Sequence, residues 1–210
     1  MTHARAERSA LCDLLDRLGP DAPTLCTGWT TRDLAAHLVL RERRPDAMGG
    51  IALRPLAGYT ESVQRGLAAK HDFPELVGLV RRPGGIYGLL PFLDAQVNTL
   101  EFFVHHEDVR RAQEGWEPRE LPADFERLLW QRLSLAARLM LRKAPVGVVL
   151  RETRTGAAAL GGPSGGERVE VAGPAGELLL FCFGRQKHAR VELKGDPDAI
   201  ARLENASIGL

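Results

Sequence analysis

The longest helical pattern in the chain limits its fold more than any other feature. The pattern begins at Pro91, a residue suited to the first turn of a helix, and runs to Gln113 or Glu114. Gly115 follows and can adopt the left-handed conformation in which many helices end. Such a long helix is a typical element of a helical bundle.

Three further segments repeat apolar residues at helical spacing and are also predicted to be long helices. These long patterns cover residues 4–18, 30–43 and 122–140, and shorter patterns cover residues 60–70 and 72–82. Four long helices suffice for a bundle. Prolines and glycines predict a loop at residues 44–56.

The sequence pattern changes after Pro145, where apolar and polar residues begin to alternate as they do in strands. Predicted strands cover residues 146–150, 168–172 and 189–193, and predicted helices cover residues 174–183 and 196–203. The Gly-rich residues 153–166 form either a loop or a hairpin connection. We therefore expect a mainly α protein, with a helical bundle at residues 1–143 and a small α+β domain at residues 144–210.

Composition excludes several classes of function. The chain has 210 residues, 28 basic and 27 acidic, with a formal net charge of +1, so we expect it to bind neither nucleic acid nor a membrane. No apolar run approaches about 20 residues and the N-terminus lacks a signal-peptide pattern, which favours a cytoplasmic protein. Cys12, Cys26 and Cys182 form no Cys-x-x-Cys pair and are expected to be buried free thiols. Both a monomer and a homodimer fit these features.

A polar stripe runs along the helix that begins at Pro91. Residues three and four apart share one side of a helix, which places Asn98, Glu101, His105 and Asp108 in one row. Apolar residues flank this row, so it is predicted to face the bundle interior, where an unpaired carboxylate is costly. A bound cation would remove that cost. The alternative is a solvent-exposed Glu–His pair or an intrahelical hydrogen bond.

A second helix offers a histidine for the same site. His37 lies among apolar residues, and Asp33, one turn earlier, is expected to cap the helix and to orient the His37 ring. His37, Glu101 and His105 satisfy three positions of a tetrahedral zinc site and leave the fourth for water or substrate. The same ligands suit iron(II) or nickel. A lone histidine inside a helix is otherwise a core residue with a hydrogen-bond partner.

The remaining histidines receive structural interpretations. His106 points about 100° around the helix from His105 and is predicted to be structural or to lie at a pocket rim. His3, His71 and His188 are expected to be solvated. Other polar residues near the stripe are assigned to caps or ligand support (Asn98 and Asp108) or to the surface (Glu42 and Glu107).

Two sequence motifs are more specific than helical spacing alone. They are LCTGWTTRDLAAHL at residues 25–38 and NTLEFFVHHEDVR at residues 98–110. Together they resemble the mycothiol-dependent maleylpyruvate isomerase family over residues 1–143, and ELLLFCFGR at residues 177–185 extends the resemblance more weakly. The resemblance implies a DinB-like four-helix bundle with a small C-terminal α/β domain. It also implies a zinc ion held by His37, Glu101 and His105, with mycothiol approaching an open metal position.

The first functional hypothesis is a thiol-dependent transferase or isomerase. Zinc at an open site lowers the pKa of a bound low-molecular-weight thiol, and the thiolate adds to an electrophilic small molecule. Arg185 is the candidate for binding a substrate carboxylate, although a cation that stabilises a helix C-terminus is the simpler interpretation. Cys26 fits a buried turn residue as well as it fits a nucleophile.

Two alternatives stay open from sequence. One is a metal-dependent hydrolase in which bound hydroxide attacks and Asp108 or Asp33 serves as general base. The other is a non-enzymatic, metal-containing bundle that binds a ligand or partner through its C-terminal domain. The sequence identifies neither the substrate nor the native metal.

Overall fold

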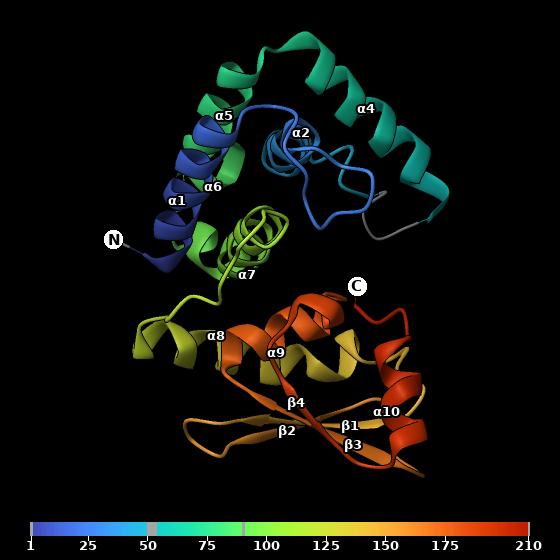
Figure 1. The fold of residues 1–210 in the computed structure, drawn as a ribbon. Coiled ribbons are helices and arrows are strands. Elements are labelled where there is room, and N and C mark those ends of the chain that lie inside the picture. Colours follow the sequence, from blue (N-terminus) through green and yellow to red (C-terminus); the bar gives the residue numbers. More distant parts are fainter. Residues whose placement is uncertain (1, 50–53, 90, 210) are drawn as a thin grey trace. The chain divides into compact units, whose positions relative to one another are not determined.

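The computed structural model describes residues 2–49, 54–89 and 91–209. It is mainly α-helical with a small α+β part, which confirms the expected fold class (Figure 1). The chain divides into two compact units, an N-terminal unit of residues 1–117 and a C-terminal unit of residues 118–210. No helix in the described residues is long and apolar enough to cross a membrane.

The N-terminal unit contains only helices and loops among its described residues. Its elements are α1 (His3–Leu18), α2 (Thr31–Arg43), the short η1 (Arg54–Leu56), α4 (Ala57–Lys70), α5 (Phe73–Arg81), α6 (Gly85–Leu89) and α7 (Pro91–Arg110). The expected loop at residues 44–56 includes η1 at its end, and its residues 50–53 lie outside the described part. The α6 helix was not predicted.

Four helices, α1, α2, α5 and α7, supply the buried core of the N-terminal unit. The core side chains follow the helical spacing of these segments, for example Leu11 and Leu15 on α1 and Leu34 and Leu38 on α2. Phe102 on α7 is fully buried in the same cluster. The apolar sides of α2 and α7 therefore face their partners, which fixes the rotation of both helices.

Local signals set the helix ends. Thr30 and Asp33 form the predicted capping box, in which the Thr30 backbone N–H donates to Asp33 at 2.9 Å. Gly115 has the left-handed conformation that we expected, with a φ of +71°, but it lies beyond the end of the helix. The α7 helix itself ends at Arg110, and a hydrogen-bonded turn follows, so the helix is shorter than its pattern.

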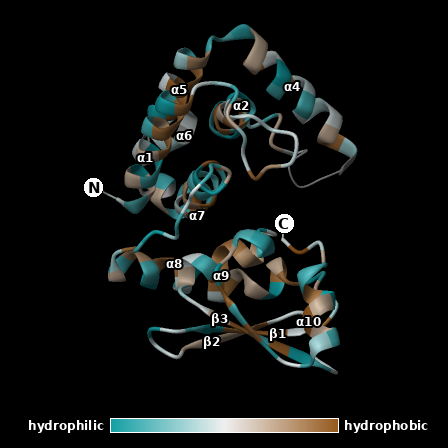
Figure 2. Ribbon diagram, in the orientation of Figure 1, coloured by the Kyte–Doolittle hydropathy of each residue, from teal (hydrophilic) through white to brown (hydrophobic). Residues whose placement is uncertain are grey.

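The C-terminal unit combines helices with a four-stranded sheet. Its elements are α8 (Ala123–Met140), β1 (Gly147–Glu152), β2 (Ala158–Gly161), β3 (Arg168–Gly173), α9 (Ala175–Cys182), the short η2 (Gln186–His188), β4 (Glu192–Lys194) and α10 (Pro197–Glu204). The strand order is β2-β1-β3-β4; β1 and β3 are parallel, and the two outer pairs are antiparallel. Of the two predictions for the Gly-rich segment, the hairpin is therefore correct. The α9 helix is apolar along most of its length (Figure 2).

The unit boundary lies at residue 117, whereas we expected the bundle to extend to residue 143. The difference is α8, which packs against α9 and β2 in the C-terminal unit instead of joining the bundle. The buried apolar stripe of α8 must pack against another element, but its spacing does not specify which element. The stripe consists of Leu129, Leu133, Ala137 and Met140. A Cβ at Gly161 would lie 3.1 Å from the Ala137 carbonyl oxygen, so this glycine allows β2 to approach α8 closely.

Candidate metal centre

The structure brings together the three residues that the sequence singled out. His37 lies on α2, and Glu101 and His105 lie one turn apart on α7. The Glu101 Oε1 atom is 2.9 Å from His105 Nε2 and 3.7 Å from His37 Nε2. One ligand-type atom from each residue lies within 4.8 Å of the other two. The face of α7 was therefore predicted correctly, whereas a metal role for these residues stays a prediction.

These distances fit one small transition ion. Nitrogen and oxygen atoms bound about 2.0–2.1 Å from a tetrahedral zinc ion lie about 3.3 Å from each other. The two spacings around Glu101 Oε1, 2.9 and 3.7 Å, bracket that value. The donor set of two imidazoles and one carboxylate is also typical of zinc sites with an open position.

Packing holds the two histidine rings. The Trp29 ring lies against the His37 ring with their centroids 4.9 Å apart, and the His37 and His105 rings meet edge to face at 5.5 Å. Both histidines are buried. Rings that are packed on their sides lose little freedom when they bind an ion, so the site is largely formed in advance.

Asp108 supports His105 from the side opposite Glu101. The Asp108 Oδ2 atom is 3.0 Å from His105 Nδ1 and accepts a hydrogen bond from the Cys26 thiol at 3.2 Å. A carboxylate on Nδ1 keeps the proton there and leaves Nε2 to act as a ligand. We had expected Asp108 to support a ligand or cap a helix, and its contact with His105 agrees with the first role.

The expectation that Asp33 orients the His37 ring is wrong. The Asp33 carboxylate accepts hydrogen bonds from both the backbone N–H and the hydroxyl of Thr30, at 2.9 Å each. The capping box thus occupies this side chain at the first turn of α2. Among the described contacts, carboxylate support for a ligand histidine comes from Asp108 on His105 instead.

Sequence reasoning missed Arg41. Its Nε atom is 3.2 Å from Glu101 Oε1, and its Nη1 atom donates to Asn98 Oδ1 at 3.5 Å. Arg41 follows His37 by four residues on α2, so the two share one face of the helix. That spacing could have identified it, but Arg41 lies in a run of charged residues, a pattern typical of a solvated helix face.

The charges of the site favour an ionised Glu101. Burial opposes ionisation, but the His105 charge, hydrogen bonds from His105 and His37, and the Arg41 charge hold the pKa of Glu101 well below its usual value. Burial likewise opposes protonation of His105, yet the Glu101 charge and the Asp108 hydrogen bond raise its pKa well above the usual value. Burial is the largest influence on His37 and lowers its pKa.

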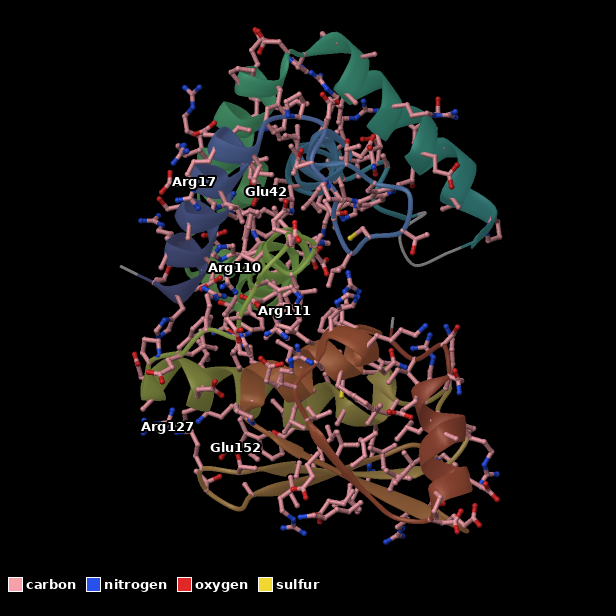
Figure 3. The ribbon with its side chains drawn as sticks, viewed as in Figure 1. Arg17, Glu42, Arg110, Arg111, Arg127 and Glu152 are labelled. Carbon is pink, nitrogen blue, oxygen red and sulfur yellow. The ribbon has the colours of Figure 1, made fainter. Side chains whose placement is uncertain are left out.

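A second polar cluster lies one helical turn along from the candidate metal centre. It includes Glu42, which we had wrongly assigned to the surface. Glu42 is buried instead of exposed, and Arg8 binds both its oxygens, at 2.5 and 3.0 Å (Glu42 is labelled in Figure 3). Arg8 also donates to Asp94 at 2.6 Å. Asn98 donates to both carboxylates, at 3.1 and 2.9 Å, and connects this cluster to Arg41. Ion pairs thus join α1, α2 and α7 directly beside the candidate ligands.

Glu107 was also wrongly assigned to the surface. Its side chain is buried and lies 2.6 Å from Arg111 Nε and 3.0 Å from Arg110 Nη1 (both arginines are labelled in Figure 3). The Arg111 guanidinium in turn stacks over the Trp116 ring at 4.7 Å. These contacts are structural, because none of them reaches the candidate ligands.

The other histidines lie outside the candidate ligand group. His106 is buried and its Nδ1 atom is 2.8 Å from the Glu7 carboxylate on α1, which agrees with the structural role predicted for it. The His71 Nδ1 atom is 3.3 Å from the Glu75 carboxylate in the first turn of α5. His3, His71 and His188 are half-buried, so they are less solvated than expected.

Arg185 and the cysteines have specific local surroundings. Arg185 follows the end of α9, and its guanidinium donates to the Phe183 carbonyl oxygen at 2.5 Å, as a cation at a helix C-terminus is expected to do. Cys12 and Cys182 are buried free thiols, and burial raises the pKa of Cys12 to about 12. Cys26 is half-buried, so the expectation of a buried thiol holds for two of the three cysteines.

Comparisons with known proteins identify the fold. No protein-family model and no curated protein sequence matches the chain. Among solved structures, the crystal structure of the mycothiol-dependent maleylpyruvate isomerase matches with a TM-score of 0.57 and 17% sequence identity, over 91% of this chain and 90% of that chain. A histidine-to-alanine mutant of that enzyme matches equally well. These matches confirm the expected resemblance in fold. At 17% sequence identity they are evidence for the fold alone.

Proposed function

We propose that the chain binds one divalent transition ion, zinc, through His37, Glu101 and His105, and uses it to activate a low-molecular-weight thiol. The observation that supports this most directly is the position of Glu101 Oε1, which is close to the Nε2 atoms of both histidines. Three protein ligands leave one tetrahedral position open. An open position is the property that separates catalytic from structural zinc sites.

Each residue of the chain has a distinct part in this proposal. Ionised Glu101 supplies negative charge to the ion, and Asp108 holds His105 with Nε2 facing the ion. Trp29 covers one side of the His37 ring and keeps water from it. A zinc ion at this position supplies the positive charge that makes a bound thiol ionise near neutral pH.

We infer that the thiol is mycothiol and that the second reactant is a small electrophile. The matching solved structures are those of a mycothiol-dependent isomerase, and the same fold here carries an imidazole–carboxylate–imidazole group. Addition of the thiolate to the electrophile, followed by isomerisation or group transfer, is the reaction class we assign. Arg185 remains a predicted ligand of a substrate carboxylate, since a guanidinium matches that group with two hydrogen bonds, and in the structure its guanidinium donates to the Phe183 carbonyl oxygen.

A hydrolase receives less support. Such an enzyme needs a carboxylate that is free to take a proton from water, and Asp33 and Asp108 were the candidates. Asp33 accepts two hydrogen bonds from Thr30, and Asp108 accepts from Cys26 beside His105. Both carboxylates are therefore already engaged in holding the local structure.

The test begins with the metal content of purified, tag-free protein, measured by inductively coupled plasma mass spectrometry. We expect about one equivalent of zinc in the parent, little in Glu101→Ala, and the parent value in Glu61→Ala, an exposed control on α4. Zinc-loaded protein is then assayed for consumption of mycothiol by electrophilic substrates. Parent protein that contains no metal and fails to bind added zinc, iron or nickel would refute the proposal. Metal binding without thiol-dependent turnover would favour the non-enzymatic alternative.

A further inference from the structure

A second group of metal-ligating side chains lies on the other side of the His105 ring. It consists of Cys26, in the loop before α2, with Asp108 and His105 on α7. The Asp108 Oδ2 atom is 3.2 Å from Cys26 Sγ and 3.0 Å from His105 Nδ1, and the thiol is 4.0 Å from Nδ1. The imidazole thus presents Nε2 to the first group and Nδ1 to the second.

The spacing of these three atoms suits a transition ion. A point equidistant from atoms separated by 3.2, 3.0 and 4.0 Å lies about 2 Å from each of them. Zinc binds histidine nitrogen and carboxylate oxygen at about 2.0–2.2 Å and thiolate sulfur at about 2.3 Å. An ion slightly above the plane of the three atoms therefore reaches all of them with a shift of a few tenths of an ångström at the sulfur.

Charge and access also favour an ion here. A thiolate and a carboxylate together balance a divalent cation, so the filled site is neutral and avoids the cost of a buried net charge. The sulfur makes it selective for thiophilic ions over magnesium or calcium. Asp108 is fully buried, but Cys26 is only half-buried, which gives an ion a route from solvent.

We propose that Cys26, Asp108 and Nδ1 of His105 form a second site, which a thiophilic divalent ion such as cadmium fills when it is added to the protein. Binding displaces the thiol proton and the proton on Nδ1, and both pass to solvent. When both sites are filled, His105 bridges the two ions as an imidazolate. Without an ion the same atoms form the hydrogen-bonded chain from Cys26 through Asp108 to His105.

The test uses Cd²⁺, because a cadmium–thiolate bond gives an ultraviolet charge-transfer band that oxygen and nitrogen ligands do not. Metal-free full-length protein is titrated with Cd²⁺, and bound metal is counted alongside the absorbance. We expect two equivalents in the parent with a thiolate band, and one equivalent without the band in Cys26→Ser. Serine keeps a hydrogen-bond donor to Asp108, so the fold should be retained. Cys12→Ala, which removes a buried thiol elsewhere in the same unit, should keep the band.

Comparison with Glu101→Ala separates this inference from the proposed function. Loss of one equivalent in Glu101→Ala with the band retained would support both sites. A thiolate band in the parent that Glu101→Ala leaves unchanged, with no change in stoichiometry, would support the second site and refute the first. Absence of a band in the parent, or a band that persists in Cys26→Ser, would overturn the second site. As a check that needs no variant, Cd²⁺ should protect Cys26 from alkylation in the parent, and unprotected alkylation would also overturn it.

Discussion

Replacement of Arg8 by methionine tests whether the buried ion pairs hold the N-terminal unit together. Arg8 contacts Glu42 and Asp94 at 2.5 and 2.6 Å, with side chains at most 3% exposed. Breaking a buried ion pair by removing one partner typically costs about 3–5 kcal/mol, because the remaining charges stay buried without compensation. Arg8 also donates to the Val80 carbonyl oxygen, and that hydrogen bond would be lost as well. We therefore expect Arg8→Met to lose at least about 3 kcal/mol of unfolding free energy.

A matched control lies on the surface of the same unit. Arg81 also contacts two carboxylates, Asp13 and Asp16 at 2.6 and 2.7 Å, but its side chain is 38% exposed. Exposed ion pairs contribute about 0–1 kcal/mol, since solvent and salt screen them. Arg81→Met should therefore change the stability by less than about 1 kcal/mol for each pair, although its two ion pairs are nearly as short as those of Arg8.

The assay is urea denaturation of the metal-free chain, followed by circular dichroism and by tryptophan fluorescence. Trp29 and Trp116 report on the N-terminal unit and Trp130 on the C-terminal unit, so two transitions can be assigned. The Arg8→Met effect should appear in the N-terminal transition and decrease little in 1 M salt, whereas any Arg81→Met effect should shrink. Equal effects of the two substitutions would refute the argument from burial.

Three further predictions concern the metal site and the C-terminal unit. His37→Ala and His105→Ala should each lose most zinc affinity in a chelator-competition assay while His106→Ala keeps it; equal loss in all three would mean that the wrong face of α7 was chosen. Asp108→Asn should weaken zinc binding about 10- to 100-fold in the same assay at alkaline pH, where no proton competes for His105, and an unchanged affinity would remove Asp108 from the site. Gly161→Ala should lower the stability of the C-terminal unit by about 1–3 kcal/mol in thermal melts, because its Cβ would crowd α8, and an unchanged melting temperature would contradict that contact.

The α7 stripe was predictable because helix geometry is local. Glu101, His105 and Asp108 lie three or four residues apart, and that spacing alone determines that one carboxylate can face each nitrogen of the His105 ring. The position of His37 opposite them depends on how α2 packs against α7. Spacing within one helix carries no information about this packing. The expectation came from the apolar neighbours of His37 on a second helix, and the motif resemblance then implied the same ligand.

The charged run that starts at Arg41 shows why other residues were misjudged. Consecutive residues of a helix point about 100° apart, so a run of charges must reach several environments. Arg41 faces Glu101, Glu42 faces Arg8 inside the bundle, and Arg43 donates to backbone carbonyl oxygens near the end of α5. The partner of Glu42 lies 34 residues away in sequence, and no local pattern identifies such a pair.

The assignment of α8 failed for a similar reason. Its apolar stripe has the same spacing as a bundle helix, and α5, which supplies the fourth side of the bundle core, is half as long. Helix length was therefore a poor guide to which helices pack together. The β2 strand, which covers part of α8, lies inside a Gly-rich segment where the strand pattern is weak.

The buried cluster around Arg8 bears on how the candidate site would function. Arg8 joins α1 to α2 through Glu42 and to α7 through Asp94, and Asn98 extends the connection to Arg41 beside Glu101. These contacts fix the two ligand-bearing helices by interactions that do not involve an ion. The site should therefore be assembled in the metal-free protein, so that chelation removes affinity for thiols without unfolding the unit. A zinc-dependent fold would show the opposite, with unfolding and metal loss occurring together.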